Sequence, residues 1–356
     1  MRLVIVALAL WLPVSGASAA PDYKAIELAA VDAQIAPGFR QFGERAAALQ
    51  QTVEAFCRKP DAKDLPAVRA GFNAVMDAWQ GVQHIGFGPV ELFNRGQRVQ
   101  FWPDKRNASD RQLLALIRDR KTADVTLARM PIISVGVQGL PALELLLFGD
   151  GQSDKLLVPG PDADFRCHLV TLISANLAAI GNDLADDFSR PDGFRAAIEV
   201  AGTAASRYAN HREAALQLFN ALYGQLHAIS EAKLTYPMGA KLDEARAQRG
   251  ESWRSKRSLW NIVMNLEAVK ATFGAAFAPA LAAEGKSDVG TRLAASLEQT
   301  IAHAKKLPPM EEAVTRPAGW KTLSDLKAQV KASAKLLEEA GGALNLQVGF
   351  NALDGD

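Results

Sequence analysis

The sequence is poor in the residues from which metal centres and disulfide scaffolds are built, with two cysteines and five histidines among 356 residues. It has no surplus of charge, because 40 basic residues stand against 39 acidic ones. That balance argues against a nucleic acid or a membrane surface as a partner held by general electrostatics. The signatures His-Glu-x-x-His and Gly-x-Ser-x-Gly are also absent, which excludes the usual zinc-peptidase helix and the serine nucleophile elbow.

The N-terminal apolar run, Leu3 to Leu12, is about half of the roughly 20 residues that a bilayer span needs. It follows Arg2 and precedes small residues that end in an Ala-x-Ala pattern at Ala19, as in a cleavable secretory signal. We therefore expect a signal peptide at residues 1–19 and a soluble, periplasmic mature protein with no membrane span.

Cys57 and Cys167 are the only thiols. An oxidising compartment would allow them to form one disulfide. The sequence alone does not show that their Cα atoms lie close enough, so the pairing stays open.

The mature sequence has no convincing period-2 strand, and its apolar residues recur at helical spacing between Pro and Gly interruptions. This pattern predicts an all-α fold of two packed helical-bundle halves, residues 20–192 and 193–356. The predicted helices are 26–57 with a kink at Pro37, 66–82 with Asp64 as N-cap, 165–188, 214–234, 259–277 and 323–344. Two irregular segments, 84–107 and 234–250, interrupt the helices, and such segments are more often functional than not.

A buried carboxylate is predicted in the apolar stretch Pro131–Phe148, where Glu144 is the one ionisable residue. A helix that is apolar all round is buried, and a buried carboxylate must be protonated, paired or bound to a metal. We expect Pro141 to kink this helix just before Glu144. Two alternatives stay open, a structural ion pair in the core and a ligand or metal site.

A second polar group follows from Glu251–Phe273 if that stretch is one helix. At about 100° per residue, one arc of it carries two arginines, a serine and two amides, without an acid or a lysine. Arginine forks suit carboxylates and other oxyanions, so the arc predicts either an anion site or a solvated face. The residues of the arc are Arg254, Arg257, Ser258, Asn261 and Asn265.

These segments resemble the imelysin family of bacterial envelope proteins, whose signature is Gly-x-His-x-x-Glu on a helix. The match here is Gly139-Leu140-Pro141-Ala142-Leu143-Glu144. The resemblance also extends over 79–84, 87–89, 101–104, 251–265 and 349–356. It implies two helical-bundle halves with the signature helix at their junction. The founding member of the imelysin family is classed as a metallopeptidase, and other members are implicated in iron uptake.

One departure from the family pattern affects the expected metal site. Pro141 stands where the family has His, so one ligand of the metal pair is missing, and a single carboxylate makes a poor transition-metal site. His84 could replace that ligand if the fold brings it near Glu144. The resemblance implies a place in the binding site for Glu144, which matches the motif. It implies the same by segment match for Arg254, Arg257, Ser258 and Asn265, and it implies a catalytic role for none of them.

We expect a periplasmic imelysin-like protein that binds a small oxyanion or a metal chelate at the junction and acts in iron uptake. Iron or another divalent metal is the expected cofactor, held by Glu144 and His84. The alternatives are a metallopeptidase and a scaffold whose loop 86–104 docks on another envelope protein. The expected ligand-binding residues are Glu144 as a fixed negative charge, Arg254 and Arg257 as anion contacts, Trp102 and Trp79 as an apolar wall, and Ser258, Asn261, Asn265 and Gln138.

Overall fold

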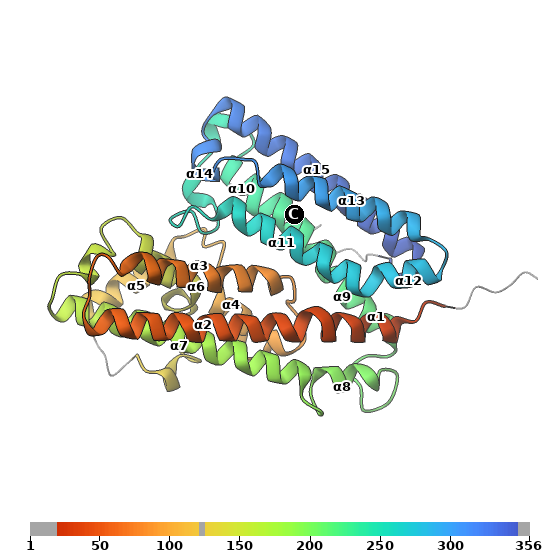
Figure 1. Cartoon of the computed structure of the whole chain (residues 1–356), viewed down its shortest axis with the longest axis horizontal. Coiled ribbons are helices and arrows are strands. Elements are labelled where there is room, and N and C mark those ends of the chain that lie inside the picture. Colours follow the sequence, from red (N-terminus) through yellow and green to blue (C-terminus); the bar gives the residue numbers. More distant parts are fainter. Residues whose placement is uncertain (1–19, 121–124, 348–356) are drawn as a thin grey trace, which may run out of the picture.

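The computed structural model describes residues 20–120 and 125–347, and every regular element in these ranges is a helix. The all-α prediction is therefore confirmed, while the predicted signal peptide lies outside the described residues. Figure 1 shows two helical layers. The N-terminal half is built on α2 (Ala36–Arg58), α3 (Leu65–Val82), α6 (Gly139–Phe148) and α7 (Pro161–Ser189), and the C-terminal half on α9 (His211–Ala228), α11 (Ser258–Thr272), α13 (Ser287–Ala304) and α15 (Pro317–Ala343).

Shorter helices connect these long ones. They are α1 (Tyr23–Ala30), α4 (Arg95–Val99), α5 (Ala108–Asp119), α8 (Phe194–Glu199), α10 (Tyr236–Met238), α12 (Ala278–Ala283) and α14 (Met310–Ala313). In the N-terminal half α2 packs between α3 and α7, and in the C-terminal half α13 packs between α11 and α15. The halves meet where α11 lies on α3 and α1 lies on α9. Since α8 packs on α1 and α7, the N-terminal layer continues past Gly193.

The predicted helices agree with the observed ones except where π-helical turns interrupt them. In the described chain such turns lie at Val31–Ile35, Ile229–Thr235 and Phe273–Phe277. The first ends two residues before Pro37, where the kink was predicted, and the residue between them keeps helical dihedral angles. Asp64 does occupy the N-cap position of α3, but its side chain makes no capping hydrogen bond.

One helical stretch of the described residues, 258–283, is long and apolar enough to cross a bilayer by length and composition. It consists of α11, the π-turn after it and α12, and it packs between α3 and α13. Asn261 and Asn265 are buried within it. The core helix of a two-layer fold meets the same criterion.

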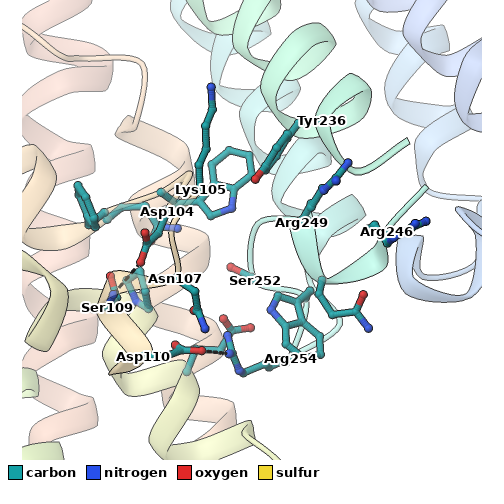
Figure 2. Close-up of a pocket in the computed structure, with 18 residues that line it drawn as sticks. Asp104, Lys105, Asn107, Ser109, Asp110, Tyr236, Arg246, Arg249, Ser252 and Arg254 are labelled. Atoms are coloured by element: carbon teal, nitrogen blue, oxygen red, sulfur yellow. Dashed lines mark hydrogen bonds and ion pairs between the residues drawn. The ribbon is translucent and has the colours of Figure 1, made fainter. Parts of the chain in front are cut away.

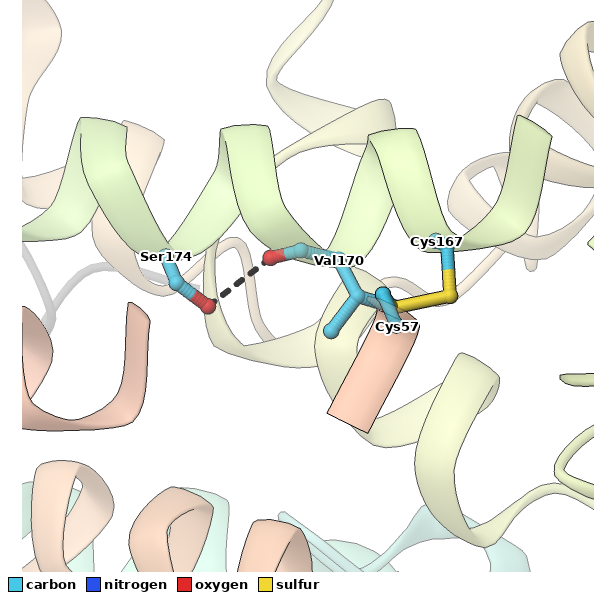
Figure 3. Close-up of a disulfide and its surroundings, with 4 residues drawn as sticks. All are labelled: Cys57, Cys167, Val170 and Ser174. Atoms are coloured by element: carbon cyan, nitrogen blue, oxygen red, sulfur yellow. Dashed lines mark hydrogen bonds between the residues drawn. A yellow bond between two sulfur atoms is a disulfide. The ribbon is translucent and has the colours of Figure 1, made fainter. Parts of the chain in front are cut away.

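Cys57, near the end of α2, and Cys167, in the second turn of α7, form a disulfide with a Cα–Cα distance of 5.7 Å (Figure 3). The question that the sequence left open is thus answered in favour of the bond. The disulfide joins two helices of the same half, α2 and α7, which also pack along their lengths.

Glu27 on α1 is a buried carboxyl between the two halves. Its Oε2 lies 3.2 Å from Nδ1 of His211 on α9, and its Oε1 has no partner among the described residues. Burial raises its pKa to about 8, although a backbone hydrogen bond from Ala215 and the charge of Lys24 act in the opposite direction. The Tyr208 side chain is buried beside it.

We expect this group to make the protein less stable as the pH rises. Unfolded glutamate loses its proton near pH 4.5 and folded Glu27 near pH 8, so the folded state binds more protons between these values. The contribution of Glu27 to the free energy of unfolding is fully present below about pH 4.5 and is lost as the pH rises to about 8. Urea unfolding of the wild type and of Glu27→Gln at pH 5, 7 and 9 measures this contribution. If the free energy of unfolding changed equally with pH in both proteins, Glu27 would not be its source.

Candidate functional site

A cavity of about 510 Å³, called cavity A, lies between the two halves. Its N-terminal wall consists of side chains from residues 100–110 with Pro141 and Glu144, and its C-terminal wall of side chains from residues 236–254. Both irregular segments of the sequence, 84–107 and 234–250, thus contribute to it. In Figure 2 Lys105 lies on one side of the cavity, and Tyr236, Arg246 and Arg249 lie on the other.

Glu144 of α6 borders cavity A and is 4% exposed. Its Oε1 accepts hydrogen bonds from the backbone N (2.8 Å) and the Oγ (2.7 Å) of Ser255, and its Oε2 has no partner among the described residues. Burial raises the pKa of Glu144, although the hydrogen bonds from Ser255 and the charge of Arg254 oppose the rise. Burial therefore makes the ionised form of Glu144 costlier than that of an exposed glutamate, and its role as a fixed negative charge stays a prediction.

The environment of Pro141 corrects a second expectation. The helix begins only at Gly139, so Pro141 lies in the first turn of α6, where its missing N–H leaves no gap in the hydrogen bonding. No kink forms before Glu144. The preceding residues Val135–Val137 form a separate 3₁₀ turn.

The stretch Glu251–Phe273 is not one helix, because residues 251–257 form a loop and α11 begins at Ser258. Two non-glycine residues of this loop, Ser252 and Lys256, have left-handed backbones with φ of 55°. Such conformations are uncommon for these residue types and need support from their surroundings. The loop places Ser255 against Glu144, so the predicted arc does not exist as drawn from the sequence.

The two arginines of that arc both pair with carboxylates of the N-terminal half. Arg254 borders cavity A, pairs with Asp110 of α5 and lies over the ring of Trp253 at 4.5 Å. Arg257 pairs with Asp77 of α3, outside cavity A. Each guanidinium therefore already has an anionic partner within the protein.

Three other cations of cavity A have no carboxylate partner among the described residues: Lys105, Arg246 and Arg249. Arg246 donates to the backbone carbonyls of Asp243 and Ala245, and Arg249 lies 5.5 Å from the centre of the Tyr236 ring. All three cations are exposed to solvent and come from both walls. With Arg254 they make four cations against three carboxylates in the lining, Asp104, Asp110 and Glu144, so cavity A carries a small excess of positive charge.

A buried ion pair lies at the junction of the two halves, where it borders a second cavity. Lys233 is 3% exposed and Glu251 is 1% exposed, and their Nζ and Oε2 are 2.8 Å apart. Lys233 also donates to Gln80, Gln83 and Asn265 over 2.6–2.8 Å. Burial alone would raise the pKa of Glu251, but Lys233 outweighs it and the pKa of Glu251 is lowered, which favours its ionised form.

The polar residues of α11 belong to this network or border it. Asn261 donates to Glu251 Oε2 at 2.9 Å, and Asn265 donates to Gln80 of α3 at 2.9 Å. Ser258 donates to Glu311. All three are buried, so the alternative of a solvated face is wrong, and none borders cavity A.

The remaining predicted residues are distributed over the N-terminal half. Trp102 borders cavity A, whereas Trp79 is buried in the wall of a neighbouring cavity. Gln138 is buried in a network with Arg98 and Asn176, away from cavity A.

The ring of His84 has one hydrogen-bonding partner among the described residues, Thr272, at 3.3 Å from its Nε2. Burial lowers the pKa of His84 to about 4. It shares no partner with Glu144. Among the described residues no three His, Cys, Asp or Glu side chains form a group that could hold a metal ion.

Sequence reasoning identified the segments of the site better than its residues. Lys105, Arg246 and Arg249 lie in the irregular segments, but nothing in the sequence distinguishes them from surface cations. Lys233 falls in a predicted helix, and the π-turn Ile229–Thr235 accompanies its inward position.

A protein-family model described as imelysin matches residues 35–337 of the chain. Iron-regulated protein A of Synechococcus elongatus is 21% identical over 238 residues, which cover 66% of this chain and 60% of that protein. The match thus spans less than two thirds of that relative's length.

Two solved structures are similar in fold. An imelysin-like protein from Psychrobacter arcticum has a TM-score of 0.75 at 18% identity, over 94% of this chain and all of the other. A candidate iron-regulated protein A precursor from Parabacteroides distasonis has a TM-score of 0.73 at 18% identity, over 92% and 97% of the two chains. At this identity the similarity establishes the two-layer helical fold.

Proposed function

This chain belongs to the imelysin family, and we propose that it is a periplasmic protein that binds a small oxyanion-bearing ligand, such as an iron chelate, in cavity A. The link to iron comes from relatives named iron-regulated protein A. The location rests on the signal-like residues 1–19 and on a relative named as a precursor.

The observation that carries the proposal is the set of cations without carboxylate partners, Lys105, Arg246 and Arg249, on both walls of one cavity. Its volume lies within the range of small-molecule sites. Because arginine and lysine donate charge-assisted hydrogen bonds to carboxylates and other oxyanions, an anionic ligand would bridge the two halves. The half-exposed Trp102 and Tyr236 supply apolar surface beside them.

Glu144 adds a pH-dependent contact. In its neutral form the carboxyl can donate a hydrogen bond from the Oε2 side to a ligand oxygen, while Ser255 occupies Oε1. An oxyanion should therefore bind more weakly as the pH rises through the raised pKa of Glu144. A metal ion bound directly to Glu144 would show the opposite trend, because its carboxylate ligand must lose the proton.

A resident metal does not fit the residues present. Pro141 removes one family ligand, His84 has no contact in common with Glu144, and no donor group of three exists in the described residues. We therefore assign the metal, if one is bound, to the chelate. The metallopeptidase alternative lacks the protein ligands that such an enzyme needs. The scaffold alternative stays untested, although Leu92 and Phe93 are exposed in its loop.

Isothermal titration of the mature protein with citrate and ferric citrate tests the proposal. We expect binding that weakens about tenfold in Lys105→Gln and in Arg249→Gln, since a hydrogen bond between charged groups contributes about 1.5–3 kcal/mol. Arg106→Gln is the matched control, because Arg106 is an exposed neighbour of Lys105 outside cavity A.

Two results would reject the proposal. One is the absence of binding to both probes, and the other is binding that Lys105→Gln and Arg106→Gln weaken equally. Glu144→Gln separates the ligand types, because the amide can still donate to an oxyanion but is a poor ligand for a metal ion.

A further inference from the structure

A second cavity of about 710 Å³, called cavity B, lies on the other side of Gln100 and Trp102, which border both cavities. Its N-terminal wall consists of side chains from residues 79–103, and its C-terminal wall of side chains from residues 225–233 with Glu251. The resemblance and the proposed function assign nothing to it. Its chemistry differs from that of cavity A.

Cavity B is lined by polar groups that have no partner in the protein. Gln225 is 5% exposed and its Nε2 is unpaired, and Trp79 is 3% exposed with an unpaired indole Nε1. The Oε1 of Gln100 is unpaired as well, while its Nε2 donates to Glu251 at 3.3 Å, which fixes the orientation of that amide. Buried polar groups are nearly always hydrogen-bonded, so each of these needs a partner.

The charges around cavity B do not suit an anion. Its one cation among the described residues, Lys233, is buried and already faces four acceptors. The carboxylates of Glu91, Glu231 and Glu251 also border the cavity. Glu231 pairs with Lys331 at 2.9 Å, and Glu251 pairs with Lys233. An anionic ligand would therefore meet carboxylates without a free cation.

We propose that cavity B binds a neutral polyhydroxylated ligand of the sugar class. The indole of Trp79 can only donate, the carbonyl of Gln100 can only accept, and the amide of Gln225 can do both. A hydroxyl group donates and accepts, so a ligand with several hydroxyls satisfies all three. Asn94 and Gln97 at the rim add two more amides without partners among the described residues, and the half-exposed Trp102 offers an apolar face for the C–H side of a sugar ring.

The sugar site and the oxyanion site share Gln100 and Trp102 as a common wall but use different hydrogen-bonding and charged groups. The hydrogen-bonding groups of the sugar site lie on α3, α9 and the residues before Trp102, whereas the cations of cavity A lie at Lys105 and in the loop 246–249. Either cavity can be tested while the other is empty.

Isothermal titration of the mature protein with glucose, N-acetylglucosamine and maltose at millimolar concentration tests the inference. We expect at least one to bind, and Gln225→Leu and Gln97→Leu each to weaken that binding at least tenfold. Because Gln225→Leu removes a buried amide that lacks a partner, its urea midpoint should not fall, which separates lost binding from lost folding. Asn220→Leu is the control on the same helix, since Asn220 lies outside the cavity and its buried Oδ1 also has no partner among the described residues.

Three outcomes would overturn the inference. The first is no heat from any of the three sugars, as expected of a cavity that holds only water. The second is sugar binding that Gln225→Leu and Asn220→Leu affect equally. The third is binding of choline without binding of sugar, which would assign the acidic rim to a cation.

Discussion

Replacing Lys233 by Met should destabilise the protein by about 3–5 kcal/mol, because it leaves Glu251 buried and ionised without its cation. The amide oxygens of Gln83 and Asn265 would lose the same donor. Urea unfolding at pH 7 measures the difference. The halves meet at this pair, so the loss should appear in the transition of the whole molecule rather than in a local one.

A second substitution at the partner supplies the control. The double variant Lys233→Met/Glu251→Gln removes the unpaired charge and should recover at least half of the lost stability. Lys241→Met breaks an exposed ion pair with Asp243 and should cost less than about 1 kcal/mol. If Lys233→Met cost no more than Lys241→Met, the buried pair would not stabilise the junction.

Gly139→Ala, at the start of the signature helix, should destabilise the protein by about 3 kcal/mol. Gly139 has a left-handed backbone with φ of 78°, which costs an alanine about 1–2 kcal/mol. An added Cβ would also lie 2.4 Å and 2.5 Å from the carbonyl oxygens of Arg98 and Val99, and overpacking of this kind costs about 1–3 kcal/mol. The displaced backbone leads directly to Gln100 and Trp102, so citrate binding in cavity A should weaken too.

Gly151→Ala is the matched control for this substitution. Gly151 also has a left-handed backbone, with φ of 63°, but a Cβ there meets no atom within 4 Å. We expect it to cost about 1–2 kcal/mol from the backbone alone and to leave binding unchanged. Equal unfolding midpoints for the two variants would show that the close contact with residues 98 and 99 is unimportant.

The fold could be predicted from the sequence because helical periodicity and Pro or Gly interruptions are local features of the chain. The predicted helix 66–82 is α3 within one residue, and the predicted 165–188 lies within α7. The loop 251–257 could not be predicted, because Ser252 and Lys256 adopt left-handed conformations that their residue types do not indicate. Arg254 and Arg257 were assigned to a helix face for this reason.

The candidate site could be predicted only in part. Glu144 stood out because it is alone in an apolar stretch, and the structure does bury it beside a cavity. Its partner Ser255 is 111 residues away in a loop, and no pattern in the sequence indicates that contact. Lys233 and Glu251 both fell in predicted helices, where nothing in the sequence distinguishes them from exposed charges, since only the packing of α11 on α3 encloses them.

The disulfide between Cys57 and Cys167 constrains only one of the two walls of cavity A. It closes residues 57–167 into a covalent ring, and every N-terminal wall residue of cavity A lies within that ring. The opposite wall, residues 236–254, lies on the open part of the chain. In polymer terms, one wall is restricted in conformational space even when the chain is unfolded and the other is not. A reductant would therefore change the entropy of only one of the two surfaces that form the cavity.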